Sequence, residues 1–393
     1  MRGSKKMFLA QSTSVEEIVS EWNSSKGDWL GLGSVTIKSL GMGGLRDLRE
    51  RFPDRILVAD LKTMDTGFME MEMAALAGAN IVTVSGIAGD ETVMNAVEAG
   101  KKYGIEIMAD ILNAGIGRAK KLEDLGVNYI MCRSALIEGL RGGISVPLVS
   151  SGSGAEVEII EKRGEISSVK KDRKKLSFNE PILQVALDLT ELKDAIRVAE
   201  LSSMGGVDWL EVGTPLIKCE GVKAVKALRE RFPQKNIVAD LKTLSNSSDE
   251  VTIAANAGAD IVGISGASCD EEIVKAVESA KRTGSYIMAD LIAMDNPVSR
   301  GVELEALGVD MLEFHISIDK QLRNESIPFS LVKDLCDSVR IPVAVAGGMK
   351  EETAPLALRS GARIVVVGGG ITHAADPECA TRGIKGAMEQ KLQ

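Results

Sequence analysis

Several residue types that would point to particular functions are scarce in this chain. Histidine occurs only twice among 393 residues, at positions 315 and 373, which is too few for a histidine-rich zinc or iron site. The five cysteines are widely spaced and form no CxxC pair, which argues against a disulfide framework and against a cysteine zinc site. Polar residues interrupt every apolar run before it approaches the roughly 18 residues of a membrane-spanning helix, so we expect a cytoplasmic protein.

Positive charge is also in deficit. Lys and Arg number 47 against 56 Asp and Glu, which gives a formal net charge of -9. Because nucleic acids and anionic membranes attract basic surfaces, neither is expected as a general partner. Any phosphate bound here should belong to a small molecule that a local feature holds.

What the chain has in abundance is internal repetition. The stretch WLGLG at 29–33 returns as WLEVG at 209–213, an offset of 180 residues. At the same offset the octapeptide VADLKTMD, which ends at Asp65, returns as VADLKTLS, which ends at Ser245. The chain therefore contains two copies of one domain-sized unit.

The second copy alternates short apolar runs with amphipathic runs of helical period. Eight strands, each followed by a helix, predict a parallel (β/α)8 TIM barrel. An open doubly wound sheet is the alternative, but polar residues at the strand ends favour a barrel, whose strand ends share one catalytic face. The predicted strands are 182–188, 208–213, 236–242, 259–265, 286–291, 310–315, 342–348 and 363–369.

The first copy shows only six such strands, so residues 1–143 predict a truncated or degenerate barrel-like repeat. Residues 144–180 resemble neither copy and are interpreted as a solvated linker or small hairpin, or as strands that close the incomplete barrel. Their KKDRKK run is expected to be a solvated surface. The catalytic barrel is expected over 181–393. The six strands are 7–11, 28–33, 56–62, 79–85, 106–111 and 128–133.

Polar residues stand at or next to the ends of five strands in the second copy. Because the strand ends of a (β/α)8 barrel surround one mouth, the fold would gather these side chains into a single site. They are Asp188, Glu211, Asp240, Lys242, Asp290 and His315.

Within this set the residue types suggest distinct roles. Glu211 and Asp240 offer hard oxygen ligands on adjacent strands, which suits a Mg²⁺ ion that keeps several waters. Lys242, on the same side of its strand as Asp240, would stay protonated among carboxylates and could stabilise a developing oxyanion or enediolate. His315 is the candidate proton shuttle because its ordinary pKa lies near neutrality. A purely structural ion-pair network of Glu211, Asp240 and Lys242 is the alternative.

Glycine clusters follow the last two predicted strands, AGG at 346–348 and VGGG at 367–370. In (β/α)8 enzymes these loops form a phosphate site from backbone N–H groups, and glycine lets the backbone approach the phosphate closely. The substrate is therefore expected to be a small phosphorylated compound. The candidate phosphate-binding residues are Gly347, Gly348, Gly368 and Gly369.

These motifs resemble the orotidine-monophosphate decarboxylase superfamily and, within it, most closely the 3-hexulose-6-phosphate synthase family. The resemblance covers 182–390, with a degenerate form over about 7–140. It implies a reversible aldehyde-lyase that joins formaldehyde and D-ribulose 5-phosphate through a Mg²⁺-bound enediolate, with Asp188 and Asp290 positioning sugar hydroxyls. The motifs are LDL (187–189), LEVGTPLIKCEG (210–221), ADLKT (239–243), ADLI (289–292), EFHISIDKQ (313–321), VAGG (345–348) and VGGGIT with AADP (367–377).

The second copy departs from the family motif DxKxxD at Ser245, where the family has aspartate, whereas the first copy keeps Asp65. The resemblance implies dimers in which this aspartate reaches into the neighbouring subunit's site. We therefore expect an intrachain pseudodimer, with or without further homo-oligomerisation, in which the first copy donates Asp65 to orient Lys242. The first copy has lost other site residues: Gly31 replaces Glu211, Arg133 replaces His315 and Gln11 roughly replaces Asp188.

Other readings stay open on the sequence. Asp60 and Lys62 in the first copy are interpreted as a leftover ion pair, with a second catalytic site as the alternative. Decarboxylation of a 3-keto sugar-acid phosphate and non-catalytic binding of a sugar phosphate are the alternative functions. The decarboxylase family has two arginines where this chain has Ile318 and Gly369 or Gly370, which favours the synthase reading.

Overall fold

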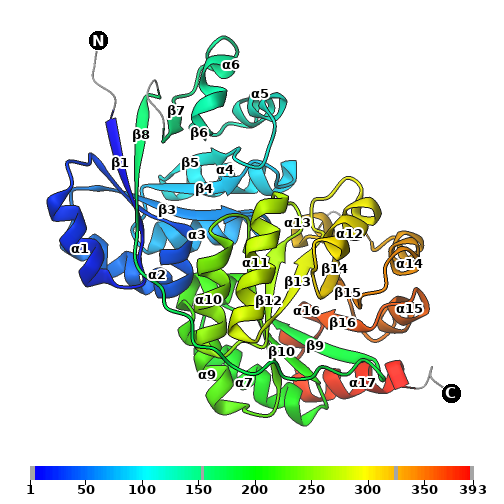
Figure 1. Cartoon of the computed structure of the whole chain (residues 1–393). Helices are drawn as coiled ribbons and strands as arrows, with labels where there is room; N and C mark the ends of the chain where they lie inside the picture. Colours follow the sequence, from blue (N-terminus) through cyan, green and yellow to red (C-terminus); the bar gives the residue numbers. More distant parts are fainter. Residues whose placement is uncertain (1–4, 152–154, 323–325, 390–393) are drawn as a thin grey trace. The chain divides into compact units, whose positions relative to one another are not determined.

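The computed structural model describes residues 5–151, 155–322 and 326–389. The chain forms two compact units, Met1–Glu165 and Ile166–Gln393, and each contains one closed barrel of eight parallel strands (Figure 1). The (β/α)8 barrel predicted for the second half is confirmed. Among the described residues, no helix combines the length and the apolar character that a membrane crossing requires.

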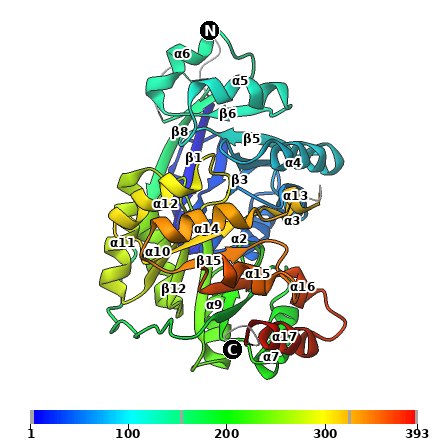
Figure 2. The same ribbon diagram turned by 90° about the vertical axis from the view of Figure 1, so that its right-hand side faces the viewer.

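The second barrel follows the predicted alternation, and every strand lies within two residues of its predicted bounds. β9 pairs with both β10 and β16, which closes the barrel. Figure 2 shows α14 (Phe329–Ser338) and α15 (Ala354–Arg359) packed next to each other on its outer side. The strands are β9 (Ile182–Leu187), β10 (Trp209–Val212), β11 (Asn236–Thr243), β12 (Ile261–Ser265), β13 (Tyr286–Asp290), β14 (Met311–His315), β15 (Val343–Ala346) and β16 (Ile364–Val367). The other helices are α7 (Leu192–Met204), α8 (Thr214–Glu220), α9 (Lys223–Arg231), α10 (Ser247–Ala257), α11 (Asp270–Thr283), α12 (Pro297–Ala306), α13 (Ile318–Gln321), α16 (Gly369–Thr372) and α17 (Pro377–Glu389).

The first barrel is complete. Of the two forms expected for this repeat, truncated or degenerate, the truncated one that ends at 143 is therefore wrong. Its last two strands come from the segment interpreted as a linker or hairpin, and both run parallel to their neighbours. The alternative, that this segment closes the barrel, is the correct one. The strands are β1 (Lys5–Gln11), β2 (Trp29–Leu32), β3 (Ile56–Thr63), β4 (Ile81–Ser85), β5 (Glu106–Asp110), β6 (Tyr129–Met131), β7 (Leu148–Ser150) and β8 (Val157–Arg163). The helices are α1 (Val15–Ser24), α2 (Ser34–Arg51), α3 (Gly67–Leu76), α4 (Asp90–Tyr103), α5 (Ile116–Asp124), η1 (Ser134–Leu136) and α6 (Ile137–Arg141).

The stretch 166–180 packs against the second barrel rather than lying free in solvent. Arg173, from the KKDRKK run, lies over the ring of Tyr286 at 3.8 Å and forms an ion pair with Asp310 at 2.7 Å. Leu176 and Phe178 pack against the apolar cluster inside the barrel. The run predicted to be a solvated surface is therefore partly a packing element.

The interior of the second barrel is layered, and this layering positions the site. Successive inward-facing residues of a strand are two positions apart, so each strand offers one deep and one shallow side chain. The deep positions are apolar and form one buried cluster that includes Trp209, Val238, Met288 and Met311. Two residues later, at the same mouth of the barrel, stand Glu211, Asp240, Asp290 and Glu313.

Candidate active site

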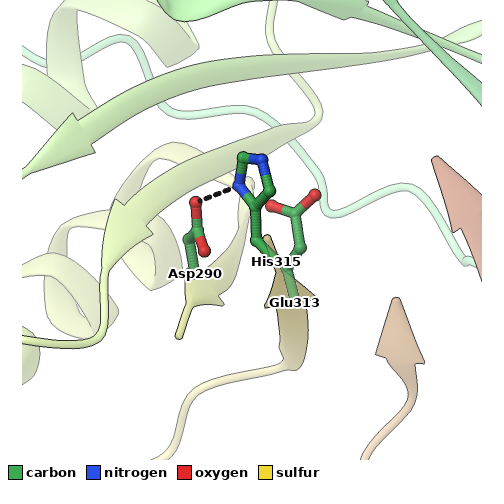
Figure 3. A group of neighbouring side chains, drawn as sticks. All are labelled: Asp290, Glu313 and His315. Atoms are coloured by element: carbon green, nitrogen blue, oxygen red, sulfur yellow. Dashed lines mark hydrogen bonds and ion pairs between the residues drawn. The ribbon is translucent and has the colours of Figure 1, made fainter. Parts of the chain in front are cut away.

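Lys242 connects two carboxylates at the mouth of the second barrel. Its Nζ lies 3.0 Å from Asp240 Oδ2 and 2.5 Å from Asp290 Oδ2. The same Asp290 oxygen lies 3.0 Å from His315 Nδ1 (Figure 3). The structure therefore brings together four of the predicted residues, which come from β11 and from the adjacent strands β13 and β14.

A local irregularity of β11 presents Lys242 to the site. The pairing of β11 with β12 shifts between Asp240 and Thr243, and Lys242 has a φ of 44°. A positive φ is uncommon for a residue with a Cβ and persists only where the surroundings hold it. In the first barrel Lys62 has a φ of 46° at the equivalent shift in β3. The repeated ADLKT sequence thus specifies the same strained bulge twice.

The charges around Lys242 keep it protonated. Burial by itself lowers the pKa of Lys242, but attraction by Asp240, Asp290 and Glu313 outweighs burial and holds that pKa well above its usual value. Burial likewise acts to raise the pKa of Asp290, but the positive charges of Lys242 and His315 outweigh it, so that pKa lies below its usual value. The pair is therefore an ammonium and a carboxylate, fixed in place without water between them.

A second group of carboxylates lies beside this pair. Gln184 Nε2 donates a hydrogen bond to Glu211 Oε2 at 2.6 Å. Burial raises the pKa of Glu211 well above its usual value, and the negative charges of Asp240 and Asp188 raise it further. Buried carboxylates that repel one another in this way are relieved by a cation among them.

The residues present fit the predicted Mg²⁺ ion. Thr214 Oγ1 donates to Asp240 Oδ2 at 2.8 Å, which leaves Oδ1 on the side of Gly263. A Cβ added to Gly263 would lie 2.9 Å from this Oδ1, so glycine keeps the space beside the oxygen open. Glu211 and Asp240 therefore supply hard oxygen donors next to a space that a side chain would fill, and this is the donor chemistry that Mg²⁺ prefers.

The first of the two predicted phosphate loops has a backbone that only glycine adopts readily. Gly347 and Gly348 have φ values of 96° and 66°. A Cβ on Gly347 would lie 2.4 Å from the carbonyl oxygen of Ile316, so no other residue fits there. Gly368 and Gly369 follow β16, and a Cβ on Gly368 would lie 3.4 Å from Asp188 Oδ2. Asp188 thus lies between the carboxylate group and the last glycine loop.

The first barrel keeps the lysine and both of its carboxylate partners, but it has lost one of the two predicted metal donors, because Gly31 stands at the position of Glu211. Lys62 forms ion pairs with Asp60, at 3.3 Å, and with Asp110. Thr83, at the position of Gly263, donates a hydrogen bond to Asp60 Oδ1 at 2.8 Å, whereas the equivalent Asp240 Oδ1 accepts a longer one, at 3.3 Å, from the backbone N–H of Lys242. The leftover ion pair predicted at Asp60 and Lys62 is present.

In the first barrel, glycine replaces the glutamate found at position 211 of the second, and a neighbouring side chain fills the vacated space. Gly31 pairs with Leu9 in the register in which Glu211 pairs with Ala186. A Cβ on Gly31 would lie 2.8 Å from Leu9 Cδ1, so the leucine fills the space that the carboxylate occupies in the second barrel. Gln11 lies against Gly33, where a Cβ would be 2.2 Å from its Oε1, much as Asp188 lies against the equivalent Gly213.

Asp65 belongs to the first unit, where its Oδ1 accepts a hydrogen bond from the backbone N–H of Thr66 at 2.7 Å. Its donation to the second barrel stays a prediction.

Two polar residues of the site were missed on the sequence, Gln184 and Glu313. Each is a polar residue inside a largely apolar strand. Gln184 stands four positions before Asp188, and Glu313 stands two positions before His315, so each lies on the inward face by strand periodicity. This even spacing from a predicted site residue was the feature of the sequence that could have identified both residues. Burial raises the pKa of Glu313 well above its usual value, and repulsion by Asp290 and Glu211 adds to this effect.

Known proteins resemble this chain over about half of its length. A 3-hexulose-6-phosphate synthase of Mycobacterium gastri is 35% identical over 206 residues, which cover 52% of this chain and 99% of that protein. A protein of the same name from Bacillus subtilis strain 168 is 39% identical over 197 residues, which cover 49% of this chain and 92% of that protein. This chain is therefore about twice as long as such relatives.

Solved structures give the same picture. The crystal structure of a 3-hexulose-6-phosphate synthase matches with a TM-score of 0.51 and 36% identity, over 52% of this chain and 99% of that chain. A 3-keto-L-gulonate-6-phosphate decarboxylase from Streptococcus mutans matches with a TM-score of 0.52 and 28% identity, over 54% of this chain and 99% of that chain. A family model matches residues 9–135 and 181–384, more than half of the chain. The chain belongs to the orotidine 5'-phosphate decarboxylase / HUMPS family.

Proposed function

We propose that the second barrel is a Mg²⁺-dependent aldehyde-lyase that joins formaldehyde and D-ribulose 5-phosphate reversibly. The observation that carries this proposal is Lys242, held between Asp240 and Asp290 with His315 on the same Asp290 oxygen. The names of relatives that are 35% and 39% identical over half of the chain support the choice of substrates.

The metal would be held by Glu211 and Asp240. When bound, Mg²⁺ would supply a positive charge that polarises the substrate oxygens and stabilises an enediolate. The chain's own contribution is to fix the two carboxylates, since Gln184 holds Glu211 at 2.6 Å and Thr214 holds Asp240 at 2.8 Å.

Lys242 and His315 would do the remaining chemistry. The protonated amine of Lys242 places a fixed positive charge where an enediolate oxygen develops negative charge, with no reorganisation at the moment of reaction. Asp290 orients the ring of His315 through Nδ1, so proton transfer falls to Nε2. The ring would take a proton from the carbon that attacks formaldehyde and return one to the new hydroxyl.

Binding of the sugar phosphate would use the remaining residues. Asp188 and Asp290 would accept hydrogen bonds from sugar hydroxyls. The backbone N–H groups of the last two strand–helix loops would hold the phosphate, because their glycines leave the backbone accessible. These residues are Gly347, Gly348, Gly368 and Gly369.

The test is an assay of formaldehyde consumption with D-ribulose 5-phosphate. We expect turnover that disappears on chelation and returns with Mg²⁺. Glu211→Gln should abolish the Mg²⁺ dependence together with the rate. A chain that folds but consumes no formaldehyde would contradict the proposal.

A decarboxylase is the second candidate, because a 3-keto-L-gulonate-6-phosphate decarboxylase is among the matching structures at 28% identity. Such an enzyme would release CO₂ from 3-keto-L-gulonate 6-phosphate, and this activity would also be lost on chelation and restored by Mg²⁺. The two activities are thus separated by the product that is measured.

A further inference from the structure

Glu313 is buried at the floor of the site, yet the proposed reaction gives it no task. The residue is 5% exposed. Among the residues that the structure describes, its carboxylate makes no hydrogen bond and no ion pair, and Figure 3 shows it facing His315 without a bond to it. Lys242 attracts this carboxylate, but repulsion by Asp290 and Glu211 is larger. Burying a carboxyl group that makes no direct bond is costly, so a cation bound directly to it would relieve this position.

Two further donor side chains lie beside Glu313. Figure 3 shows Asp290, Glu313 and His315 gathered in one place, from the ends of β13 and β14. One ligand atom from each lies within 4.8 Å of the other two. An ion with bonds of about 2.0–2.2 Å needs ligand atoms about 3.5 Å apart, so shifts of about 1 Å would close the set around it.

We propose that Asp290, Glu313 and His315 form a second divalent-cation site, distinct from the Glu211–Asp240 pair and selective for a borderline ion such as Zn²⁺ or Co²⁺. The imidazole is the discriminating ligand. Mg²⁺ prefers a shell of oxygens and water, whereas Zn²⁺ and Co²⁺ bind one imidazole with carboxylates more tightly.

An ion at this site competes with Lys242. Asp290 Oδ2 now lies 2.5 Å from Lys242 Nζ and 3.0 Å from His315 Nδ1, and the ion would take over both the oxygen and the ring. Lys242 would keep Asp240, at 3.0 Å, as its partner. Zn²⁺ would therefore inhibit turnover in the presence of Mg²⁺, a consequence that rests on the proposed function.

The first barrel provides a natural comparison. It retains Asp110 at the position of Asp290, but Met131 and Arg133 stand at the positions of Glu313 and His315. A cationic side chain in place of an imidazole excludes a metal ion. The proposal therefore predicts one such ion per chain rather than two.

The experiment uses Co²⁺ as the probe, added to the full chain in excess Mg²⁺. A mixed nitrogen and oxygen site of low coordination number gives strong visible d–d absorption, whereas Co²⁺ in an all-oxygen octahedral shell absorbs weakly. We expect absorption that saturates at about one equivalent of Co²⁺ and is lost on adding Zn²⁺. Glu313→Gln, which keeps the side-chain shape, should weaken binding at least tenfold. Asp110→Asn and His373→Asn are matched controls and should bind like the parent chain.

Three results would overturn the proposal. The first is that the parent chain gives no such absorption. The second is that Glu313→Gln keeps the absorption. The third is that Glu313→Gln keeps it while Glu211→Gln loses it, which would place the Co²⁺ ion at the Glu211–Asp240 pair. If circular dichroism shows that Glu313→Gln does not fold, X-ray absorption of the Zn²⁺-loaded parent chain decides. One imidazole with carboxylate oxygens supports the site, and an all-oxygen shell refutes it. None of these readouts needs the sugar substrate, so failure of the proposed reaction would leave them intact.

Discussion

At the scale of single residues, the two barrels differ by exchanges that act together. Glu211 in the second barrel has Gln184 as its hydrogen-bond partner and a small neighbour, Ala186, on β9. The first barrel has glycine in place of the acid and leucine in place of the alanine. Removal of the buried charge and filling of its space thus belong to one change, which keeps the interior packed.

The lysines provide a matched pair of substitutions. Lys242→Ala should lower kcat on the order of a hundredfold or more, because it removes a preorganised positive charge from the reacting oxygens. Lys62→Ala removes an equally buried ion pair from the barrel that lacks the glutamate donor, so it should leave kcat within about twofold. Steady-state kinetics of the two purified variants checks this. Equal losses would mean that the loss reflects destabilisation rather than catalysis.

Restoring the acid in the first barrel should be destabilising. Gly31→Glu would force a side chain against Leu9, whose Cδ1 lies 2.8 Å from the position of the new Cβ. Overpacking of a core costs about 1–3 kcal/mol, and a buried carboxyl group without its glutamine adds to that. Adding Leu9→Ala should recover part of the loss. Urea unfolding of the single and double variants measures both, and an unaffected single variant would contradict the packing account.

At the scale of elements, the stretch 166–180 stabilises the second barrel. Arg173→Ala would remove the stacking on Tyr286 and the ion pair with Asp310. We expect a loss of about 1–2 kcal/mol in the free energy of unfolding, since a cation over a ring and a partly exposed ion pair each contribute about 1 kcal/mol. Lys175→Ala, from the same basic run, is the control and should have little effect. Similar losses for both variants in chemical denaturation would exclude a specific role for Arg173.

Elements with strong local patterns could be predicted, and weakly patterned ones could not. The eight strands of the second barrel are near-continuous apolar runs, so their positions follow from composition alone. β7 has only three residues, and β8 carries alternating charges, VEIIEKR, that are also typical of an exposed hairpin. β8 is a strand because it pairs with β1, some 150 residues earlier, and local sequence does not encode such a pairing.

The same contrast holds within the site. Asp240, Lys242, Asp290 and His315 lie at or near strand ends and could be predicted, because the barrel topology gathers those ends. The hydrogen bonds from Gln184 to Glu211 and from Thr214 to Asp240 could not be predicted, because they depend on how the side chains pack. Glu313 was recognisable only from its place on the inward face.

At the scale of the whole molecule, the division of labour between the two copies remains to be tested. We expect Asp65→Asn to lower turnover about a hundredfold or more, because the carboxylate predicted to orient Lys242 would lose its charge. Ser245→Ala should be nearly silent, since the serine offers no charge to lose. Kinetics of the two variants, with circular dichroism to confirm folding, measures this asymmetry. Equal losses of turnover in Asp65→Asn and Ser245→Ala would contradict the proposal that the first copy donates Asp65.

The closure of the first barrel has a consequence for how such a copy survives. A sheet of only six strands would leave rims of unpaired N–H and C=O groups on β1 and β6, which recruit other chains into aggregates. β8 pairs with β1 along all 7 of its residues and leaves no such rim. Loss of a site side chain from this copy can therefore leave its resistance to aggregation intact, because that resistance depends on the backbone pairing of β1, β7 and β8 and not on the side chains of the site.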